Sequence, residues 1–294
     1  MFNFRNYSAN NFVRRIIKLL VTPFMTLKYF LPVKNLKREG LAIVLIIKDE
    51  AQYITEWINF HVKQGASHFF IYDNESTDNL YETLQPFITQ GLVTYKKFPG
   101  KIRQTDAYNH AIYNYRKKFK YMAFIDTDEF LFTPNNTESG ALYNFMDNFM
   151  KQHKNAGGIG VNWLVFGSNG HETKPDGGVL ENFIMCVEKD TPVNYHIKTI
   201  CDPMKVFNWY HVHFPGYYRG YHNLSENGEI IEDPFSKIVS FDKIRINHYL
   251  YKSKEEYIQK IARGRADANI QRSIKDFHGH ECNIITDTEI LSHI

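Results

Sequence analysis

Apolar runs and amphipathic stretches alternate along the first half of the chain. The run LAIVLII at positions 41–47 is continuous, which is typical of a parallel strand buried on both faces. The next stretch has apolar residues at helical spacing from Tyr53 to His61 and ends at Gly65. The alternation continues with strands predicted at 68–72, 92–95 and 121–125, and helices at 80–90 and 106–117. This order predicts a doubly wound, Rossmann-like α/β sheet.

The second half of the chain is less regular. Residues 215–235 show no periodicity, which indicates a loop-rich segment. Ser253 and Glu256 have the spacing of a capping box, so a helix is predicted from there to about Arg265. The remaining predicted elements are helices at 140–151 and 179–187, a strand at 157–166, two strands within 198–214 broken at Asp202-Pro203, and a last strand at 244–249.

Three carboxylates follow the predicted strand that begins at Tyr121, in the run YMAFIDTDEF. Ligands in open α/β sheets bind beyond the carboxyl ends of the strands, so the position suits a site. If the chain stays extended, Asp126 and Asp128 point to the same side, and two like charges repel unless a cation lies between them. Oxygen ligands of this kind suit Mg²⁺ or Mn²⁺. The alternative is an acidic loop or helix cap without function.

A second acidic loop, at residues 73–78, follows the predicted strand at 68–72. It would lie beside the first acidic cluster, where it can meet the base and ribose of a nucleotide by hydrogen bonds. The alternative is an Asx-turn with Asp78 as a helix N-cap. No Gly-x-Gly-x-x-Gly follows the first strand and no Walker motif is present, so neither dinucleotide nor P-loop chemistry is indicated.

Charge and cysteine content add two expectations. The three cysteines are an odd number without metal-ligand spacing, which favours a reducing cytosol over a disulfide framework. Residues 1–40 hold eight Lys or Arg and one Glu, a net charge of +7, so the rest of the chain carries −4 of the total of +3. A nucleic-acid-binding protein usually has the opposite distribution, and no nucleic-acid partner is expected.

The basic N-terminal segment is amphipathic. Phe12, Ile16, Leu19 and Leu20 fall on one helical face, with basic residues beside them. The longest uncharged run is too short to span a bilayer, and no signal-peptide cleavage site follows. The segment therefore predicts either peripheral contact with an anionic membrane or a helix that packs on the domain.

Several blocks of the sequence together resemble a known family. They are KDEAQYITEW at 48–57, YDNESTD at 72–78, FIDTDEF at 124–130, FGSNGH at 166–171 and INHYLYKSKEEYIQKIARG at 246–264. In this order they are similar to the family-92 glycosyltransferases and to bacterial family-2-like enzymes close to them. The resemblance covers about residues 41–290 and implies a GT-A fold, a nucleotide-sugar donor, a divalent metal and an inverting reaction.

The resemblance also implies roles for residues. Asp126 and Asp128 would hold Mn²⁺ or Mg²⁺ against the diphosphate, and His213 or His248 would complete the metal site. The donor would be bound by Lys48, Asp49, Glu50, Asp73, Asn74, Asp126, Thr127, Asp128 and Lys198. Lys198 and Arg263 are candidates to offset phosphate charge, although a surface role is the alternative for each.

The reaction needs a general base on the acceptor side. Glu172, Asp176 and Glu181 are the candidates, and Glu181 ranks first because it matches a helix that the family has there; a solvated helix residue is the alternative. Aromatic side chains that can stack on the acceptor sugar are Trp163, Trp209, Tyr217, Tyr218 and Tyr221, with core packing as the alternative for Trp163.

Together these observations predict an inverting, metal-dependent hexosyltransferase. The arm at 1–40 would precede a GT-A domain at 41–294, with a nucleotide-sugar half at 41–135 and an acceptor half at 136–294. The donor would be UDP-linked, with galactose the family-level guess, and the acceptor a glycan or lipid-linked glycan such as a lipopolysaccharide or capsule precursor. The enzyme would be cytoplasmic, on the inner face of the membrane. The alternatives are a nucleotidyltransferase that makes a nucleotide sugar and a non-catalytic glycan-binding protein.

Overall fold

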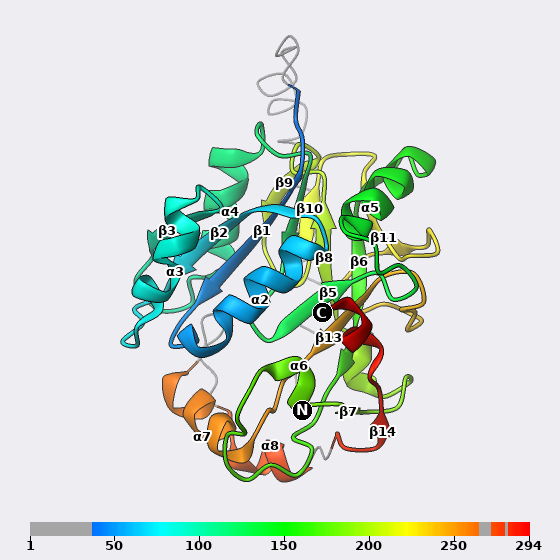
Figure 1. Cartoon of the computed structure of the whole chain (residues 1–294). Helices are drawn as coiled ribbons and strands as arrows, with labels where there is room; N and C mark the ends of the chain where they lie inside the picture. The colour runs from blue at the N-terminus through cyan, green and yellow to red at the C-terminus, as the bar shows by residue number, and fades with distance from the viewer. Residues whose placement is uncertain (1–36, 265–271, 280–281) are drawn as a thin grey trace.

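The structure is a computed structural model that describes residues 37–264, 272–279 and 282–294. Its centre is a large mixed sheet with strand order β12-β11-β6-β8-β4-β1-β2-β3, and β13 and β5 extend it beside β6. Strands β3, β2, β1 and β4 are parallel, and β8 is the antiparallel strand that joins β4 to β6. The predicted α/β class, a mostly parallel sheet flanked by helices, is confirmed (Figure 1).

The elements of the first half follow the predicted alternation. They are β1 (Leu41–Ile47), α2 (Ala51–Lys63), β2 (Ala66–Asp73), α3 (Leu80–Thr89), β3 (Val93–Lys97), α4 (Gln104–Tyr115), β4 (Tyr121–Phe124) and β5 (Glu129–Phe132). Every residue of β1 is buried, as expected for a central parallel strand. Strand β5 was not predicted, and it forms by pairing antiparallel with β13.

The second half contains more and shorter elements. They are α5 (Ala141–Gln152), β6 (Ala156–Val165), α6 (Val179–Asn182), β7 (Met185–Cys186), the 3₁₀ helix η1 (Pro192–Tyr195), β8 (Ile197–Cys201), β9 (Val206–Trp209), β10 (Pro215–Tyr217), β11 (His222–Leu224), β12 (Ile230–Ile231), β13 (Arg245–His248), α7 (Lys254–Arg263), α8 (Ile274–Gly279), β14 (Ile285–Thr286) and the 3₁₀ helix η2 (Glu289–His293).

Three predictions for this half are wrong in part. The helix predicted at 179–187 ends at Asn182, because the residues after it pair with β14 instead. The segment 215–235 is not purely loop, since β11 pairs with β6 and β12 pairs with β11. The second strand within 198–214 ends at Trp209, so His211 to Phe214 form part of the connection to β10.

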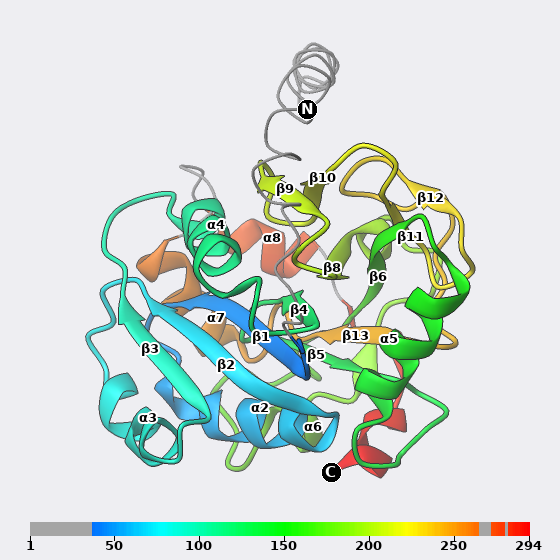
Figure 2. The ribbon, with the colours of Figure 1, turned by 90° about the horizontal axis from the view of Figure 1, so that it is seen from above.

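Two apolar layers cover the sheet. Helices α2, α3 and α5 pack on one face, around Trp57, Leu84 and Met146. Helix α4 and the β9–β10 hairpin pack on the other face, around Tyr108 and Trp209, and Figure 2 shows the two layers on either side of the strands. The carboxyl ends of β1, β2 and β4 therefore share one edge of the sheet, which α7 borders (Figure 1).

The N-terminal arm lies almost wholly outside the described residues, so the structure does not test its predicted helix. Its last part does contact the domain: Arg38 donates to Asp202 Oδ1 at 2.7 Å, in an ion pair that is largely buried. Within the described residues, no helix is both long enough and apolar enough to cross a bilayer.

Candidate active site

The chain turns sharply between the two aspartates that the sequence singled out. Strand β4 ends at Phe124, β5 begins at Glu129, and the amide of Glu129 donates to the carbonyl of Asp126 at 3.1 Å. The premise of an extended chain is therefore wrong, and the Asp126 and Asp128 side chains have different partners. Each carboxylate is paired with a buried lysine from a distant element.

Asp126 belongs to a cluster at the start of β8. Its Oδ2 accepts from Lys198 Nζ at 2.7 Å, and its Oδ1 accepts from Gln104 Nε2 at 2.8 Å. Lys198 Nζ also lies 3.5 Å from Glu129 Oε2, and both Lys198 and Glu129 are fully buried, whereas a third of the Asp126 side chain is exposed. Lys198, which was predicted to bind the donor, is thus adjacent to Asp126.

Burial acts on the pKa values of both Lys198 and Glu129 in this cluster. It would lower the pKa of Lys198, but the carboxylates of Asp126 and Glu129 outweigh it and hold that pKa well above its usual value. Burial raises the pKa of Glu129 well above its usual value, with Lys198 opposing and Asp126 adding to the shift. The Oε1 atom of Glu129 is buried and has no partner among the described residues, which suits a carboxyl that holds a proton.

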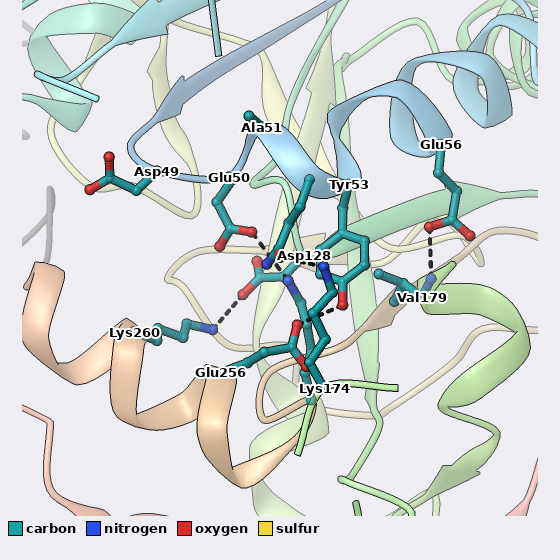
Figure 3. Close-up of polar contacts among 12 residues, drawn as sticks. Asp49, Glu50, Ala51, Tyr53, Glu56, Asp128, Lys174, Val179, Glu256 and Lys260 are labelled. Atoms are coloured by element: carbon teal, nitrogen blue, oxygen red, sulfur yellow. Dashed lines mark hydrogen bonds and ion pairs between the residues drawn. The ribbon is translucent and has the colours of Figure 1, made fainter. Parts of the chain in front are cut away.

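Asp128 is paired with a lysine of α7. Its Oδ2 accepts from Lys260 Nζ at 2.6 Å (Figure 3). The same oxygen lies 3.5 Å from His248 Nε2. Burial would raise the pKa of Asp128, but the adjacent Lys260 and His248 hold it well below the usual value. Asp128 is therefore an ionised carboxylate, nine-tenths buried, with a cationic partner already in contact.

A cavity of about 450 Å³ opens beside this pair. Its walls come from the end of β1, from the 73–78 loop and from α7, and they include Lys48, Asp49, Glu50, Gln52, Thr77, Leu250, Tyr251, Lys252, Glu256, Gln259, Lys260, Ala262 and Arg263. Four basic side chains, Lys48, Lys252, Lys260 and Arg263, thus line one space, which makes it suited to an anionic ligand.

Glu50 holds two of these cations in place. Its carboxylate accepts from Lys252 Nζ at 3.2 Å and from Arg263, and it is almost fully buried. Burial would raise the pKa of Glu50, but Lys252 and Arg263 outweigh that effect and lower it. Glu50 therefore positions basic side chains at the cavity, and Figure 3 shows it beside Asp128.

The second acidic loop is held to the end of β1 by its own side chains. Asp49 Oδ1 accepts from the amide and the hydroxyl of Thr77 at 2.6 and 3.1 Å. Asp73 accepts from the amide of Ser76 and from Tyr95, and Asn74 donates to two backbone carbonyls. Asp49 and Thr77 line the cavity, whereas Asp73 and Asn74 are buried and do not. The helix that follows the loop has Asn79 as its N-cap, not Asp78 as the turn alternative predicted.

The ligand atoms that the chain offers fit a divalent metal whose coordination shell is completed by the substrate. Asp128 Oδ2 and His248 Nε2 lie close enough to meet one cation, and Mg²⁺ sites use one or two carboxylates plus substrate phosphates. Among the described residues, no group of three or more His, Cys, Asp or Glu side chains is arranged to hold a metal alone. His213 directs its Nδ1 to the carbonyl of Ile197 at 2.8 Å, and among the described residues no hydrogen bond or ion pair joins it to Asp126 or Asp128. Of the two candidate histidines, His248 is the one in contact with an aspartate.

The three candidate bases lie around α6 and the loop before it. Glu172 is three-quarters exposed and pairs with Lys254 at 2.8 Å, and Asp176 and Glu181 are exposed. Helix α6 is positioned by Glu56 of α2, whose carboxylate accepts from the amide of Val179 at 2.7 Å (Figure 3). No hydrogen bond or ion pair in the described parts of the chain joins the three to Asp126 or Asp128.

The residues predicted to stack on the acceptor sugar fall into two groups, those packed in the core and one beside the candidate metal ligands. Trp209 and Tyr217 are buried in the layer beneath α4, and Tyr218 is buried as well, so core packing explains these three. Trp163 differs, because its ring lies 4.2 Å from that of His248. It is the predicted stacking residue that lies beside the metal candidates.

Sequence reasoning missed three residues of the site: Lys252, Lys260 and Gln104. Lys252 and Lys260 fall within the block at 246–264 that carries the family resemblance. Lys260 also lies one helical turn before Arg263, so both point to the same side of α7, which was an available signal. Nothing in the sequence distinguishes Gln104 from other first-turn residues of a helix.

Residues 44–278 match the model of Glycosyltransferase family 92. The chain belongs to this family. A glycosyltransferase family 92 protein of Oryza sativa subsp. japonica is 27% identical over 148 residues, which is 50% of this chain and 25% of the relative. A galactan beta-1,4-galactosyltransferase of Arabidopsis thaliana is 36% identical over 93 residues, which is 28% of this chain and 18% of the relative. These matches span a quarter or less of the curated relatives.

Solved structures resemble the family-92 chain more distantly. Residues 1–349 of S. aureus TarS in complex with UDP have 12% identity and a TM-score of 0.35, over 56% of this chain and 47% of that chain. Glucosyl-3-phosphoglycerate synthase from Mycobacterium tuberculosis, in complex with Mn²⁺, UDP and glucosyl-3-phosphoglycerate, has 16% identity and a TM-score of 0.29, over 46% and 49%. At these scores no residue of this chain is assigned from either structure.

Proposed function

We propose that this family-92 chain transfers a hexose from a UDP-linked sugar to a glycan acceptor, with inversion at the anomeric carbon and with a divalent metal. One observation carries the proposal: a cavity lined by four basic side chains adjoins a buried, ionised aspartate at the carboxyl edge of a Rossmann-like sheet. The cations suit a diphosphate, and the edge is where open α/β sheets bind nucleotides.

The donor would lie with its diphosphate against α7. Lys252, Lys260 and Arg263 supply positive charge there, and in the absence of ligand each is paired with Glu50 or Asp128. Asp49, after β1, and Thr77, in the loop after β2, would meet the ribose or base, beside Lys48 on the same wall. The name of the Arabidopsis relative supports galactose as the transferred sugar.

The metal, Mn²⁺ or Mg²⁺, would be held by Asp128 and His248 together with the diphosphate, with Asp126 and Thr127 in the same turn. When bound there, the cation supplies Lewis-acid stabilisation of the departing diphosphate. Lys198, which is fully buried, donates to Asp126 at 2.7 Å in this arrangement. His213 is not part of this proposed metal site.

In the reaction, an acceptor hydroxyl attacks the anomeric carbon as the bond to the diphosphate breaks. One direct displacement inverts that centre, so an α-linked donor gives a β-linked product. The hydroxyl proton passes to a base on the acceptor side. Glu181, Asp176 and Glu172 stay the carboxylate candidates, and each would have to approach the donor when substrates bind.

The acceptor and the location are proposed from sequence alone. A lipid-linked glycan such as a lipopolysaccharide or capsule precursor would suit the basic arm, which would rest on the inner face of an anionic membrane. Residues 1–36 lie outside the described structure, so this part of the proposal depends on their composition.

Calorimetric titration of UDP tests the donor site. We expect binding in Mn²⁺, loss of most binding in EDTA, and a decrease of about tenfold or more, ~1.4 kcal/mol, in Asp128→Ala. Asp106→Ala is the matched control, because Asp106 is an exposed carboxylate on α4 that pairs with Arg103. Failure of UDP to bind with or without metal would reject the UDP-sugar proposal.

A further inference from the structure

Aromatic and imidazole rings surround Trp163 at the ends of β6 and β8. The Trp163 ring stacks on His196 at 4.8 Å and 16°, and it packs against His248 at 4.2 Å. His213 meets the same ring edge-on at 5.2 Å. Since His248 also contacts Asp128, Trp163 connects the candidate metal ligands to a second group of rings.

This second group reaches the surface. His213 stacks with His211 at 5.1 Å, and His196 packs edge-to-face with Phe235 at 4.5 Å. Trp163 and His248 are buried, His196, His211 and His213 are half-buried, and the Phe235 side chain is 43% exposed. The rings thus form a continuous layer from Asp128 to solvent, which we call the ring layer.

Its hydrogen-bonding atoms are arranged for hydroxyl groups. His196 Nδ1 lies 2.9 Å from the carbonyl of Val193, and His213 Nδ1 lies 2.8 Å from the carbonyl of Ile197. Each Nδ1 must carry the proton to donate to its carbonyl, so each Nε2 has a lone pair that accepts. The indole Nε1–H of Trp163 is buried without a partner in the described residues, so it offers a donor for a water or a ligand hydroxyl.

Burial also disfavours a positive charge on two histidines of the ring layer. Burial lowers the pKa of His196 and lowers that of His213 well below its usual value, and the Lys198 charge adds to both shifts. Lys198 itself is buried and pairs with Asp126 and Glu129. Lys198 is therefore not available to an anionic ligand on the ring layer.

We propose that the ring layer of Trp163, His196, His211, His213 and Phe235 is the acceptor subsite, and that it takes a neutral pyranose. Ring faces pack against the C–H face of a sugar, and the two Nε2 atoms accept from its hydroxyls. The proposal rests on the proposed function and deepens it. The donor cavity and the ring layer meet at Asp128, through Lys260 on one side and His248 on the other, so a sugar on the ring layer lies next to the anomeric carbon.

Tryptophan fluorescence can report this binding directly. Trp57 and Trp209 are fully buried elsewhere in the core, so a sugar on the ring layer acts mainly on Trp163. The probes are three neutral disaccharides, β-1,4-galactobiose, cellobiose and chitobiose, with digalacturonate as the charged counterpart. Each is titrated at neutral pH into the full chain, with and without saturating UDP and Mn²⁺.

We expect a saturable change for at least one neutral disaccharide and a weaker one for digalacturonate. The change should vanish in Trp163→Phe, and the affinity should fall about tenfold in His213→Ala and in Phe235→Ala. Tyr113→Ala, which removes an exposed ring from the outer side of α4, should leave the affinity unchanged. UDP binding should stay unchanged in Phe235→Ala.

Three results would overturn the subsite: no neutral probe binds in either condition, digalacturonate binds more tightly than its neutral counterpart, or His213→Ala and Phe235→Ala bind as the wild type does. If UDP binding succeeds in the same protein, these results reject the subsite and leave the proposed function standing. Sugar binding without UDP binding would support the ring layer as a sugar site and reject the UDP-dependent function.

Discussion

Lys260 Nζ lies 2.6 Å from Asp128 Oδ2, and both side chains are about nine-tenths buried. The carboxylate proposed to hold a metal is therefore already paired with a cation supplied by α7. A divalent ion that binds Asp128 has to share or replace this contact. Lys260 and the divalent ion would compete for Asp128 Oδ2. This competition can be measured without an activity assay.

Substitution of Lys260 by Met should make folding depend on metal. The change leaves Asp128 buried without its charge partner, which typically costs about 3–5 kcal/mol. We expect Mn²⁺ to recover part of this loss, because it neutralises the same carboxylate. Urea denaturation of wild type and Lys260→Met, each in Mn²⁺ and in EDTA, measures the effect as a larger metal-dependent gain in the variant.

The matched control for this experiment is Lys254→Met, on the same helix. Lys254 pairs with the exposed carboxylate of Glu172, and such pairs contribute about 0–1 kcal/mol. An equal response to Mn²⁺ in wild type, Lys254→Met and Lys260→Met would show that metal and Lys260 do not compete at Asp128.

The local parts of this fold could be predicted from sequence. Strand β1 has the predicted bounds, because a continuous apolar run needs no distant partner to be recognised. Helix α7 begins at the predicted capping box, and both of its hydrogen bonds, between Ser253 and Glu256, are present. In each case neighbouring residues carry the whole signal.

Elements that depend on distant pairing could not be predicted. Strands β11 and β12 have three and two residues, too few to show a period, and they form because β6 offers an edge. In the site, the acidic run was found, but its partner Lys260 lies 132 residues away from Asp128. Only the tertiary structure brings this lysine to the carboxylate.

Arg263 should act on the diphosphate rather than on the nucleoside. Its side chain lines the cavity and pairs with Glu50, which leaves its guanidinium at the proposed phosphate position. In Arg263→Met we expect the affinity for UDP to fall about tenfold, ~1.4 kcal/mol, and the affinity for uridine to change little. Calorimetry with UDP, UMP and uridine measures the difference, with Lys254→Met as control. Equal losses for UDP and uridine would contradict a phosphate contact.

His61 should make the protein acid-sensitive. It is fully buried between Trp57 and Leu131, with its Nδ1 against the carbonyl of Trp57 and its Nε2 accepting the amide of Leu131, and burial lowers its pKa to about 3. Because the folded pKa lies below the unfolded one, this stability is complete above pH 6.5 and is lost as the pH falls toward 3.

Within that pH window, His61 changes the free energy of unfolding by about 1.4 kcal/mol per pH unit. We expect His61→Gln to be less stable at pH 7 and to have a shallower pH dependence between pH 6 and pH 4, by about this slope. Urea denaturation across the range measures it, with half-buried His222 as the site of a matched His222→Gln control. Parallel pH profiles for His61→Gln and wild type would show that His61 does not remain neutral in the folded protein.

Lys198 should control a second, opposite pH dependence. Burial raises the pKa of Glu129, and Lys198 opposes that shift. In Lys198→Met the opposition is gone, so the pKa of Glu129 should rise further while Asp126 loses its partner. A carboxyl with a raised folded pKa adds stability below its unfolded pKa, and this stability is lost as the pH rises through the folded value.

Lys198→Met should therefore be destabilised by about 3–5 kcal/mol at pH 8 and by less at pH 5. The double variant Lys198→Met/Glu129→Gln separates the causes, because the amide fills the same space and cannot ionise. We expect it to recover much of the loss at pH 8 and to lose the added pH dependence. Urea denaturation of wild type, Lys198→Met and the double variant at both pH values gives the six free energies of unfolding. A loss that is equal at pH 5 and pH 8, and unchanged by Glu129→Gln, would assign it to packing rather than to the buried carboxyl.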